Sequence, residues 1–167
     1  MQVKNIMSQP PVTCPIDGTL DQPARLMWEF DCGIIPVVND DGRLAGVVTD
    51  RDICMAAYFN GKPLWHIPIG TAMAHAVIAV HAEDRIEVVE MLMRENQIRR
   101  VPVVDNDGRP VGVVSMNDLA RLASREKVDN LDRELVETLA EVSTPRRPDG
   151  LDVPADLTVA VRPVVSL

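Results

Sequence analysis

Aromatic residues are scarce in this chain of 167 residues. Phe, Trp and Tyr make up only 3% of it, although 46% of the residues are hydrophobic. A core built from this composition must therefore be aliphatic, made of Val, Ile, Leu, Met and Ala side chains. The length allows one ordinary domain or two small units that share a core.

Long apolar runs are also missing. No stretch approaches the ~20 consecutive apolar residues that a membrane-spanning helix needs. The first seven residues, MQVKNIM, lack the apolar centre of a secretory signal peptide. We therefore expect a cytoplasmic protein without a membrane partner. The net charge of −8 also argues against nucleic acid as a partner, because a nucleic-acid binder needs a basic face to neutralise phosphates.

The cysteines show no metal-binding or disulfide pattern. Cys14, Cys32 and Cys54 are odd in number, and none of them forms a C-x-x-C pair. They could form a metal or redox site with the three histidines only in space, because no two of these residues have the spacing of metal ligands. We expect reduced, structural cysteines and no metal site.

An internal repeat is the main positive feature. Residues 46–52 (GVVTDRD) are echoed 66 positions later by residues 112–118 (GVVSMND), and the same offset holds without a gap for residues 7–53. A gap-free register over a whole unit indicates a duplicated supersecondary structure.

Each copy predicts the order β-α-β-β-α. In the first copy, a short extended segment at 12–14 precedes a helix. Strands at 35–38 and 44–48 follow, joined by an Asp-Gly turn at 39–42, which is a hairpin signal. A second helix begins at Asp50.

The first helix of this copy has its own signals. Thr19 or Asp21 is expected to cap it, Pro23 falls in its first turn, and Cys32-Gly33 is expected to end it. The residues expected on its buried face are Leu20, Ala24, Met27 and Trp28.

These patterns divide the chain into five parts. They are a first repeat at 1–60, a linker at 61–68, a second repeat at 69–123, an amphipathic helix at 124–143 and a proline-containing tail at 144–167. In the linker, Trp65 is expected to pack against one repeat.

Apolar residues at helical spacing among acidic ones predict the C-terminal helix. They are Val128, Leu131, Leu135, Leu139 and Val142. The sequence does not decide whether this helix packs on the repeats or on a second subunit. In the tail, residues 157–161 alternate and could add a strand.

A hydroxyl followed three residues later by a carboxylate opens the last helix of each repeat, as Thr49/Asp52 and Ser115/Asp118. A helix start suits an anion such as phosphate, because its backbone N–H groups are free. The carboxylate can accept hydrogen bonds from sugar hydroxyls. An Asp at this position can also simply cap the helix, so both interpretations stay open on these residues alone.

Two tandem units, each with Gly-h-h-Thr/Ser-x-x-Asp after a Pro-Val-Val strand and an Asp-Gly turn, resemble a CBS-domain pair (a Bateman module). The resemblance covers residues 1–122. It implies an α/β (α+β) fold, with two β-α-β-β-α units packed sheet to sheet by pseudo-twofold symmetry. It also implies clefts that bind an adenosine nucleotide, namely AMP, ADP, ATP or S-adenosylmethionine, with no cofactor required.

The resemblance assigns roles to individual residues. Asp52 and Asp118 are expected to hold ribose hydroxyls, and Thr49 and Ser115 to contact phosphate or ribose. The other residues implied are Ile34, Ile35, Pro36, Arg51, Val80 and His81 for the Asp52 cleft, and Cys14, Pro15, Arg99, Arg100, Val101, Pro102 and Asn117 for the Asp118 cleft.

The two clefts are not expected to be equal. Arg99 and Arg100 precede the proline strand of the second repeat, where the first has Gly33 and Ile34. A guanidinium is a strong, fork-shaped partner for phosphate. We therefore expect the Asp118 cleft to bind phosphorylated nucleotide more tightly, and the Asp52 cleft to prefer a less charged adenosyl ligand.

No catalytic constellation is readable, and the two motif carboxylates belong to separate units, so we expect no enzyme. The leading hypothesis is a regulatory adenosine-nucleotide sensor that acts through a homodimer or an unidentified protein partner. The alternative is a ligand-independent dimerising scaffold. A redox or metal module that uses the cysteines ranks lower.

Overall fold

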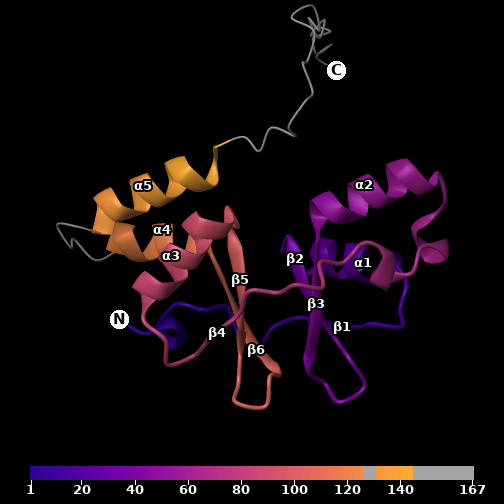
Figure 1. The fold of residues 1–167 in the computed structure, drawn as a ribbon, viewed down its shortest axis with the longest axis horizontal. Coiled ribbons are helices and arrows are strands. Elements are labelled where there is room, and N and C mark those ends of the chain that lie inside the picture. The colour runs from indigo at the N-terminus through magenta and orange to yellow at the C-terminus, as the bar shows by residue number, and fades with distance from the viewer. Residues whose placement is uncertain (126–130, 145–167) are drawn as a thin grey trace, which may run out of the picture.

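The computed structural model describes residues 1–125 and 131–144 (Figure 1). In chain order the elements are η1 (Val3–Asn5), β1 (Cys14–Pro15), α1 (Asp21–Glu29), β2 (Ile34–Val38), β3 (Leu44–Thr49), α2 (Asp50–Asn60), η2 (Leu64–His66), η3 (Ile69–Thr71), β4 (Val80–His81), α3 (Ile86–Asn96), β5 (Arg100–Val104), β6 (Pro110–Ser115), α4 (Met116–Arg125) and α5 (Leu131–Val142).

The two repeats form two three-stranded sheets of identical topology. In the first sheet β1 pairs with β2 in parallel, and β2 pairs with β3 antiparallel. β4, β5 and β6 repeat this arrangement. Figure 1 shows the sheets side by side at the centre of the molecule with the helices outside them. The predicted β-α-β-β-α duplication and its mixed α+β fold are confirmed.

The Asp-Gly turns are formed as predicted. Gly42 and Gly108 have φ of 75° and 79°, the left-handed region that glycine adopts without steric cost. The Asn39 side-chain oxygen accepts hydrogen bonds from the backbone N–H of Asp41 and Arg43 at 3.1 and 2.9 Å. The two turns also meet, because Leu44 N–H donates to the Gly108 carbonyl at 2.8 Å.

The opening segment of each repeat crosses to the other repeat. Ser8 exchanges backbone hydrogen bonds with Val113 on β6, and Ala74 does the same with Val47 on β3. The cores follow this exchange. Val3 is buried in the aliphatic core of the second repeat, whereas Ile67, Ile69 and Met73 are buried in that of the first.

Gly46 explains how these crossing segments come so close. A Cβ at Gly46 would lie 2.7 Å from Met73 Sδ and 2.9 Å from the Ala74 carbonyl oxygen. A Cβ at Gly112 would lie 2.7 Å from Met7 Sδ in the same way. The glycine that opens each repeated motif is therefore required by the segment that passes over it.

The ends of α1 differ from the prediction. Neither Thr19 nor Asp21 caps the helix. The Thr19 hydroxyl donates to the Asp21 carboxylate at 2.6 Å, and Leu20 occupies the cap position without a side-chain bond. The helix ends at Glu29, before the expected Cys32-Gly33, because Asp31 takes a left-handed φ of 48°. Pro23 lies in the first turn, as predicted.

The aromatic residues lie outside the core. Trp28 is 89% exposed, so the prediction that it lies on the buried face of α1 is wrong. Trp65 is 62% exposed and lies in η2, which contacts α1 of the first repeat. Phe30, Tyr58 and Phe59 are also more than half exposed. All five aromatics of the chain therefore lie on the surface of the first repeat and the linker, on or beside α1, α2 and η2. The aliphatic side chains fill the core without them.

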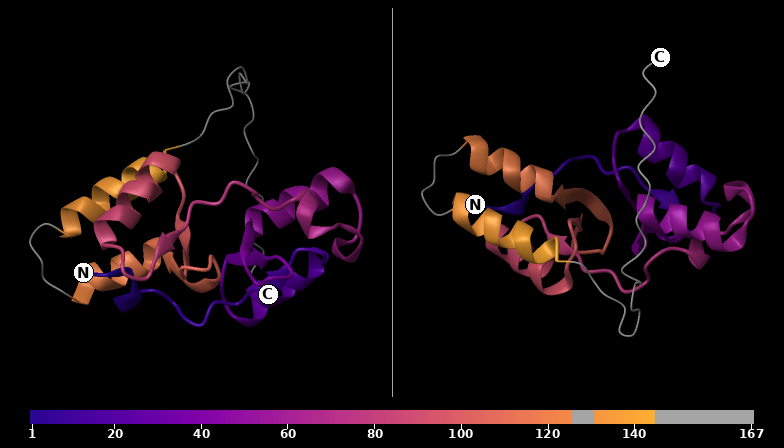
Figure 2. Two further views of the ribbon diagram at one scale, coloured as in Figure 1. Left: turned by 60° about the horizontal axis from the view of Figure 1, so that its bottom comes forward. Right: turned by 90° about the horizontal axis from the view of Figure 1, so that it is seen from above.

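The C-terminal helix, α5, packs on α3 and α4 of its own chain (Figure 2). It buries Leu135, Thr138 and Val142, while Leu139 stays half-exposed. Val128 and the run at 157–161 lie outside the described residues. Within residues 1–125 and 131–144, no helix is long and apolar enough to cross a bilayer.

Candidate functional site

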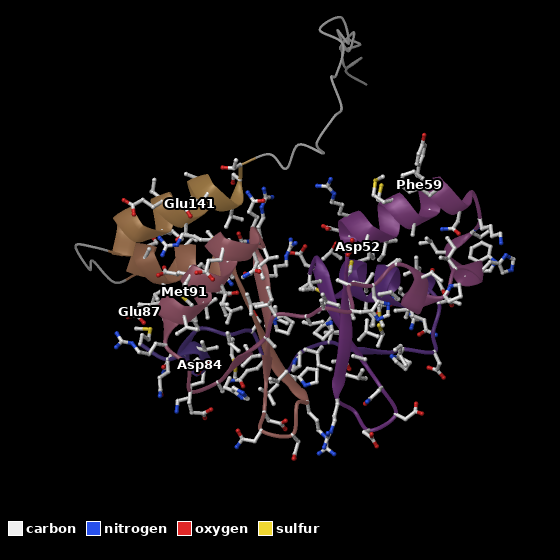
Figure 3. All side chains as sticks on the ribbon, viewed as in Figure 1. Asp52, Phe59, Asp84, Glu87, Met91 and Glu141 are labelled. Atoms are coloured by element: carbon white, nitrogen blue, oxygen red, sulfur yellow. The ribbon has the colours of Figure 1, made fainter. Side chains whose placement is uncertain are left out.

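The first motif carboxylate is fixed by its own helix start. Thr49 caps α2, and its hydroxyl accepts from the Asp52 N–H at 3.3 Å. The Asp52 Oδ2 atom accepts in return from the Thr49 N–H at 2.9 Å and the Thr49 hydroxyl at 2.7 Å. This reciprocal capping box satisfies two otherwise free N–H groups. The carboxylate therefore has a capping role, and Asp52 lies at the end of α2 nearer the sheets (Figure 3).

The second motif repeats this geometry and adds a cation. Asp118 Oδ2 accepts from the Ser115 N–H at 2.8 Å and the Ser115 hydroxyl at 2.6 Å. Its other oxygen, Oδ1, forms an ion pair with the Arg121 guanidinium. Asp118 is only 5% exposed, whereas the Arg121 side chain is 60% exposed. Both oxygens of this buried carboxylate are thus occupied by groups of the same helix start.

An open pocket of about 510 Å³ lies beside Asp118. Its lining residues are Met1, Asn5, Ile6, Ser8, Asp118, Arg121 and Leu122. The N-terminal wall is held in place by backbone bonds of 2.9 Å from Val3 N–H and Lys4 N–H to the second repeat. This wall and Arg121 were missed by the sequence analysis. The sequence did hold a signal for Arg121, because it lies three residues after Asp118 on a predicted helix, a spacing that lets an acidic and a basic side chain meet.

The predicted site residues fall into separate groups. Ile34 pairs with Thr49 across β2 and β3, and Arg100 pairs with Ser115 across β5 and β6, so each lies next to its motif. Buried Ile35 and Pro36 continue along β2, and buried Val101 and Pro102 along β5.

The predicted site residues of β1 and β4 lie further from the motifs, along β2 and β5. Cys14 and Pro15 pair with the far end of β2, and Val80 and His81 pair with the far end of β5. Three residues separate these pairs from the motif end of the strand, about 10 Å. None of the four lines the pocket at Asp118.

The arginines are also distributed between the repeats. Arg51 and Asn117 are exposed in the first turns of α2 and α4. Arg99 is exposed, and its carbonyl accepts from Met116 N–H at 3.0 Å. The Arg100 guanidinium reaches the first repeat, since a Cβ at Gly33 would lie 2.6 Å from it.

Burial dominates the chemistry of the cysteines. It raises the pKa of the Cys14 thiol to about 11. It also raises the pKa of Cys32, against a smaller lowering by a backbone hydrogen bond and by Arg100. Cys54 is exposed on α2. Among the described residues, no group of three or more His, Cys, Asp or Glu could hold a metal ion.

We expect alkylation of the native protein to separate the three thiols. At pH 8 iodoacetamide should label Cys54 quickly, Cys32 slowly and Cys14 only after unfolding, because a protonated, buried thiol is a poor nucleophile. Peptide mass spectrometry over time gives the three rates. Rapid native labelling of Cys14 would contradict the burial described here.

Comparison with known proteins identifies the class. The CBS domain model matches residues 3–58 and again residues 69–125. The chain is 34% identical over 118 residues to the CBS domain-containing protein YhcV of Bacillus subtilis, which is 71% of this chain and 82% of that protein. This chain therefore belongs to the CBS-domain family.

A second relative is much longer than the matched region. The chain is 32% identical over 125 residues to L-aspartate semialdehyde sulfurtransferase of Methanocaldococcus jannaschii. The match covers 75% of this chain but only 24% of the length of that protein.

Solved structures of CBS pairs have the same fold. The CBS domain pair of MJ0100, in complex with 5′-methylthioadenosine and S-adenosyl-L-methionine, aligns with a TM-score of 0.69 at 31% identity, over 75% of this chain and 97% of that one. CBSX2 in complex with AMP aligns with a TM-score of 0.66 at 26% identity, over 76% and 98%. Hypoxic Response Protein I, with two coordinated zinc ions, aligns with a TM-score of 0.66 at 33% identity, over 72% and 98%.

Proposed function

We propose that this chain is a cytoplasmic regulatory CBS pair that binds an adenosine ligand and is not itself an enzyme. The carrying observation is the pair of carboxylates at the starts of α2 and α4, of which Asp118 lines an open pocket. The relatives bound to AMP or to S-adenosyl-L-methionine support the ligand class.

The chemistry of the two sites fits binding rather than catalysis. Each carboxylate can accept hydrogen bonds from the two hydroxyls of a ribose, and the hydroxyl beside it can bond phosphate or ribose. Ile34, Val101 and their neighbouring prolines offer apolar surface for adenine. Since each carboxylate is held by its own repeat, the two do not form a general acid–base pair.

A ligand panel tests this function. Thermal unfolding is measured with AMP, ADP, ATP, S-adenosylmethionine and NAD, because a ligand that binds only the folded state raises its stability, by about 2.7 kcal/mol at 100 times its dissociation constant. We expect AMP, ADP or ATP to stabilise the protein. Asp118→Ala should lower the affinity for this nucleotide by about 10- to 100-fold, because hydrogen bonds to a charged group are lost. Asp52→Ala should lower it less.

Asp40→Ala, in an exposed turn, is the matched control and should leave binding unchanged. Binding that survives Asp118→Ala but not Asp52→Ala would reverse the ranking of the clefts. If no adenosine ligand at millimolar concentration stabilises the protein, the sensor function is wrong.

The exposed aromatics favour the alternative, a dimerising module. Surfaces of monomers rarely expose large apolar side chains together, yet α2 presents Met55, Tyr58 and Phe59 between Arg51 and Lys62. On α5, exposed Val136 and Leu139 lie beside the acidic Glu137 and Glu141. Arg51 and Lys62 of the first surface can pair with Glu137 and Glu141 of the second.

We take the occupant of this surface to be a second copy of the chain. Helices α2 and α5 lie at opposite ends of one side of the molecule in Figure 1, and the view from above in Figure 2 agrees. A two-fold rotation can therefore set each α2 against the α5 of the partner in a closed, reciprocal contact. Such a dimer is compatible with either function.

A further inference from the structure

We propose that Arg121 is the residue that selects phosphorylated ligands at the Asp118 pocket, through an ion pair that the ligand must exchange. This inference rests on the proposed adenosine-binding function and names the chemistry of one of its two sites. Arg121 lies one helical turn beyond the Ser-x-x-Asp motif and is not part of it.

The starting point is that Asp118 has only one acceptor position to spare, because a carboxylate offers about four and three are in use. Ser115 donates twice to Oδ2, at 2.8 and 2.6 Å, and Arg121 occupies Oδ1. A ribose that binds through two hydroxyls needs two acceptor positions, so one of the present partners must leave. The Ser115 bonds cap α4 and are retained with the helix, so Arg121 is the partner that the ribose displaces.

Arg121 is able to make this exchange. Its side chain is 60% exposed and lines the same pocket as Asp118. An exposed guanidinium on a long stem moves at little cost, whereas the 5% exposed Asp118 carboxylate must keep a partner. Sugar hydroxyls can be that partner for Asp118, and a phosphate in the same pocket can receive the planar fork of Arg121.

This exchange couples two parts of the ligand. A nucleotide supplies hydroxyls for Asp118 and a phosphate for Arg121, so both groups end with partners. A nucleoside supplies only the hydroxyls and must break the ion pair without replacing it. Inorganic phosphate can pair with Arg121 but supplies no pair of ribose hydroxyls for Asp118. The pocket therefore responds to ribose and phosphate on one molecule more strongly than to either alone.

The first repeat serves as an internal comparison. The position equivalent to Arg121 is Met55, and Asp52 has no ion pair among the described residues. Its Oδ1 atom is thus open to a ribose without an exchange. Besides Arg99 and Arg100, Arg121 is therefore a further charge that the second repeat has and the first lacks at the equivalent position.

The test replaces Arg121 with methionine, the residue at the equivalent position of the first repeat. Affinities for AMP, adenosine and inorganic phosphate are measured by titration calorimetry on the full chain in the Asp52→Ala background, which leaves the second pocket. With Arg121 present, AMP should bind about 30-fold more tightly than adenosine, the contribution of one charge-assisted pair. Arg121→Met should remove most of this ratio by weakening AMP, and adenosine should bind as well or better.

Arg121→Lys keeps the charge but not the fork and should give an intermediate ratio, which also separates selectivity from folding. If AMP binds Arg121→Met within twofold of its affinity for the parent, the proposal is wrong. Adenosine and AMP binding equally to the parent also overturns it, while leaving the adenosine-binding function intact. If neither ligand binds any variant or the wild type, the proposed function itself fails, and this inference with it.

Discussion

Replacing Gly46 with alanine should lower the free energy of unfolding by about 2 kcal/mol. The new methyl group would lie 2.7 Å from Met73 Sδ and 2.9 Å from the Ala74 carbonyl oxygen. The methionine can turn away, but the carbonyl belongs to backbone that pairs with Val47 at 3.1 and 2.9 Å. Moving it weakens both hydrogen bonds and shifts the crossing segment away from the core.

Urea denaturation measures this loss, and Gly70→Ala is the matched control. Gly70 lies in η3 near the same segment and has no atom within 4 Å of a built Cβ. Its replacement should change stability by less than about 0.5 kcal/mol. Equal stability of the two variants would mean that Gly46 is not packed under residues 73 and 74.

Introducing a charge at Tyr58 should separate the two copies of a dimer. In the proposed contact between α2 and the partner's α5, Tyr58→Glu would place a carboxylate among apolar side chains and opposite the acidic Glu137 and Glu141. A buried, unpaired charge costs about 3 kcal/mol or more. The dimer dissociation constant should therefore rise at least about 100-fold. Light scattering after size-exclusion chromatography gives the mass at several concentrations.

Met91→Glu provides the control for this charge. Met91 is another partly exposed apolar residue, but it lies on α3, away from Phe59 and Glu141 (Figure 3). It should leave the mass unchanged, and Glu141→Arg should partly restore the Tyr58→Glu dimer. A wild-type protein that is monomeric at all concentrations would contradict the contact.

Local patterns in the sequence predicted the elements well. The duplication, the Asp-Gly hairpins and the start of α2 at Asp50 depend on residues close in the chain, and the structure confirms them. The exchange of Ser8 and Ala74 between the repeats was not predicted, because a pairing between distant segments leaves no periodic signal. Trp28 was misplaced because helical spacing identifies a face but does not say what covers it.

The candidate site was predictable only in part. The bonds between Thr49 and Asp52 follow from the residue types at the cap, so they could be anticipated. Arg121 was not predicted, because a comparison of the two repeats highlights the residues they share. The first repeat has Met55 at the position equivalent to Arg121. The difference between Arg121 and Met55 can give the two repeats different ligand preferences.

The crossing segments make the repeat an incomplete folding unit. Residues 69–125 on their own would lack Val3 and Ser8, which complete the core and edge of that repeat, and would carry the buried Ile69 and Met73 with nothing to cover them. The duplicated half can be completed only by another half, whether joined to it or on another chain. Topologically, the chain is a strand-swapped dimer of one repeat whose two copies have become covalently linked, and we expect the two halves to unfold together.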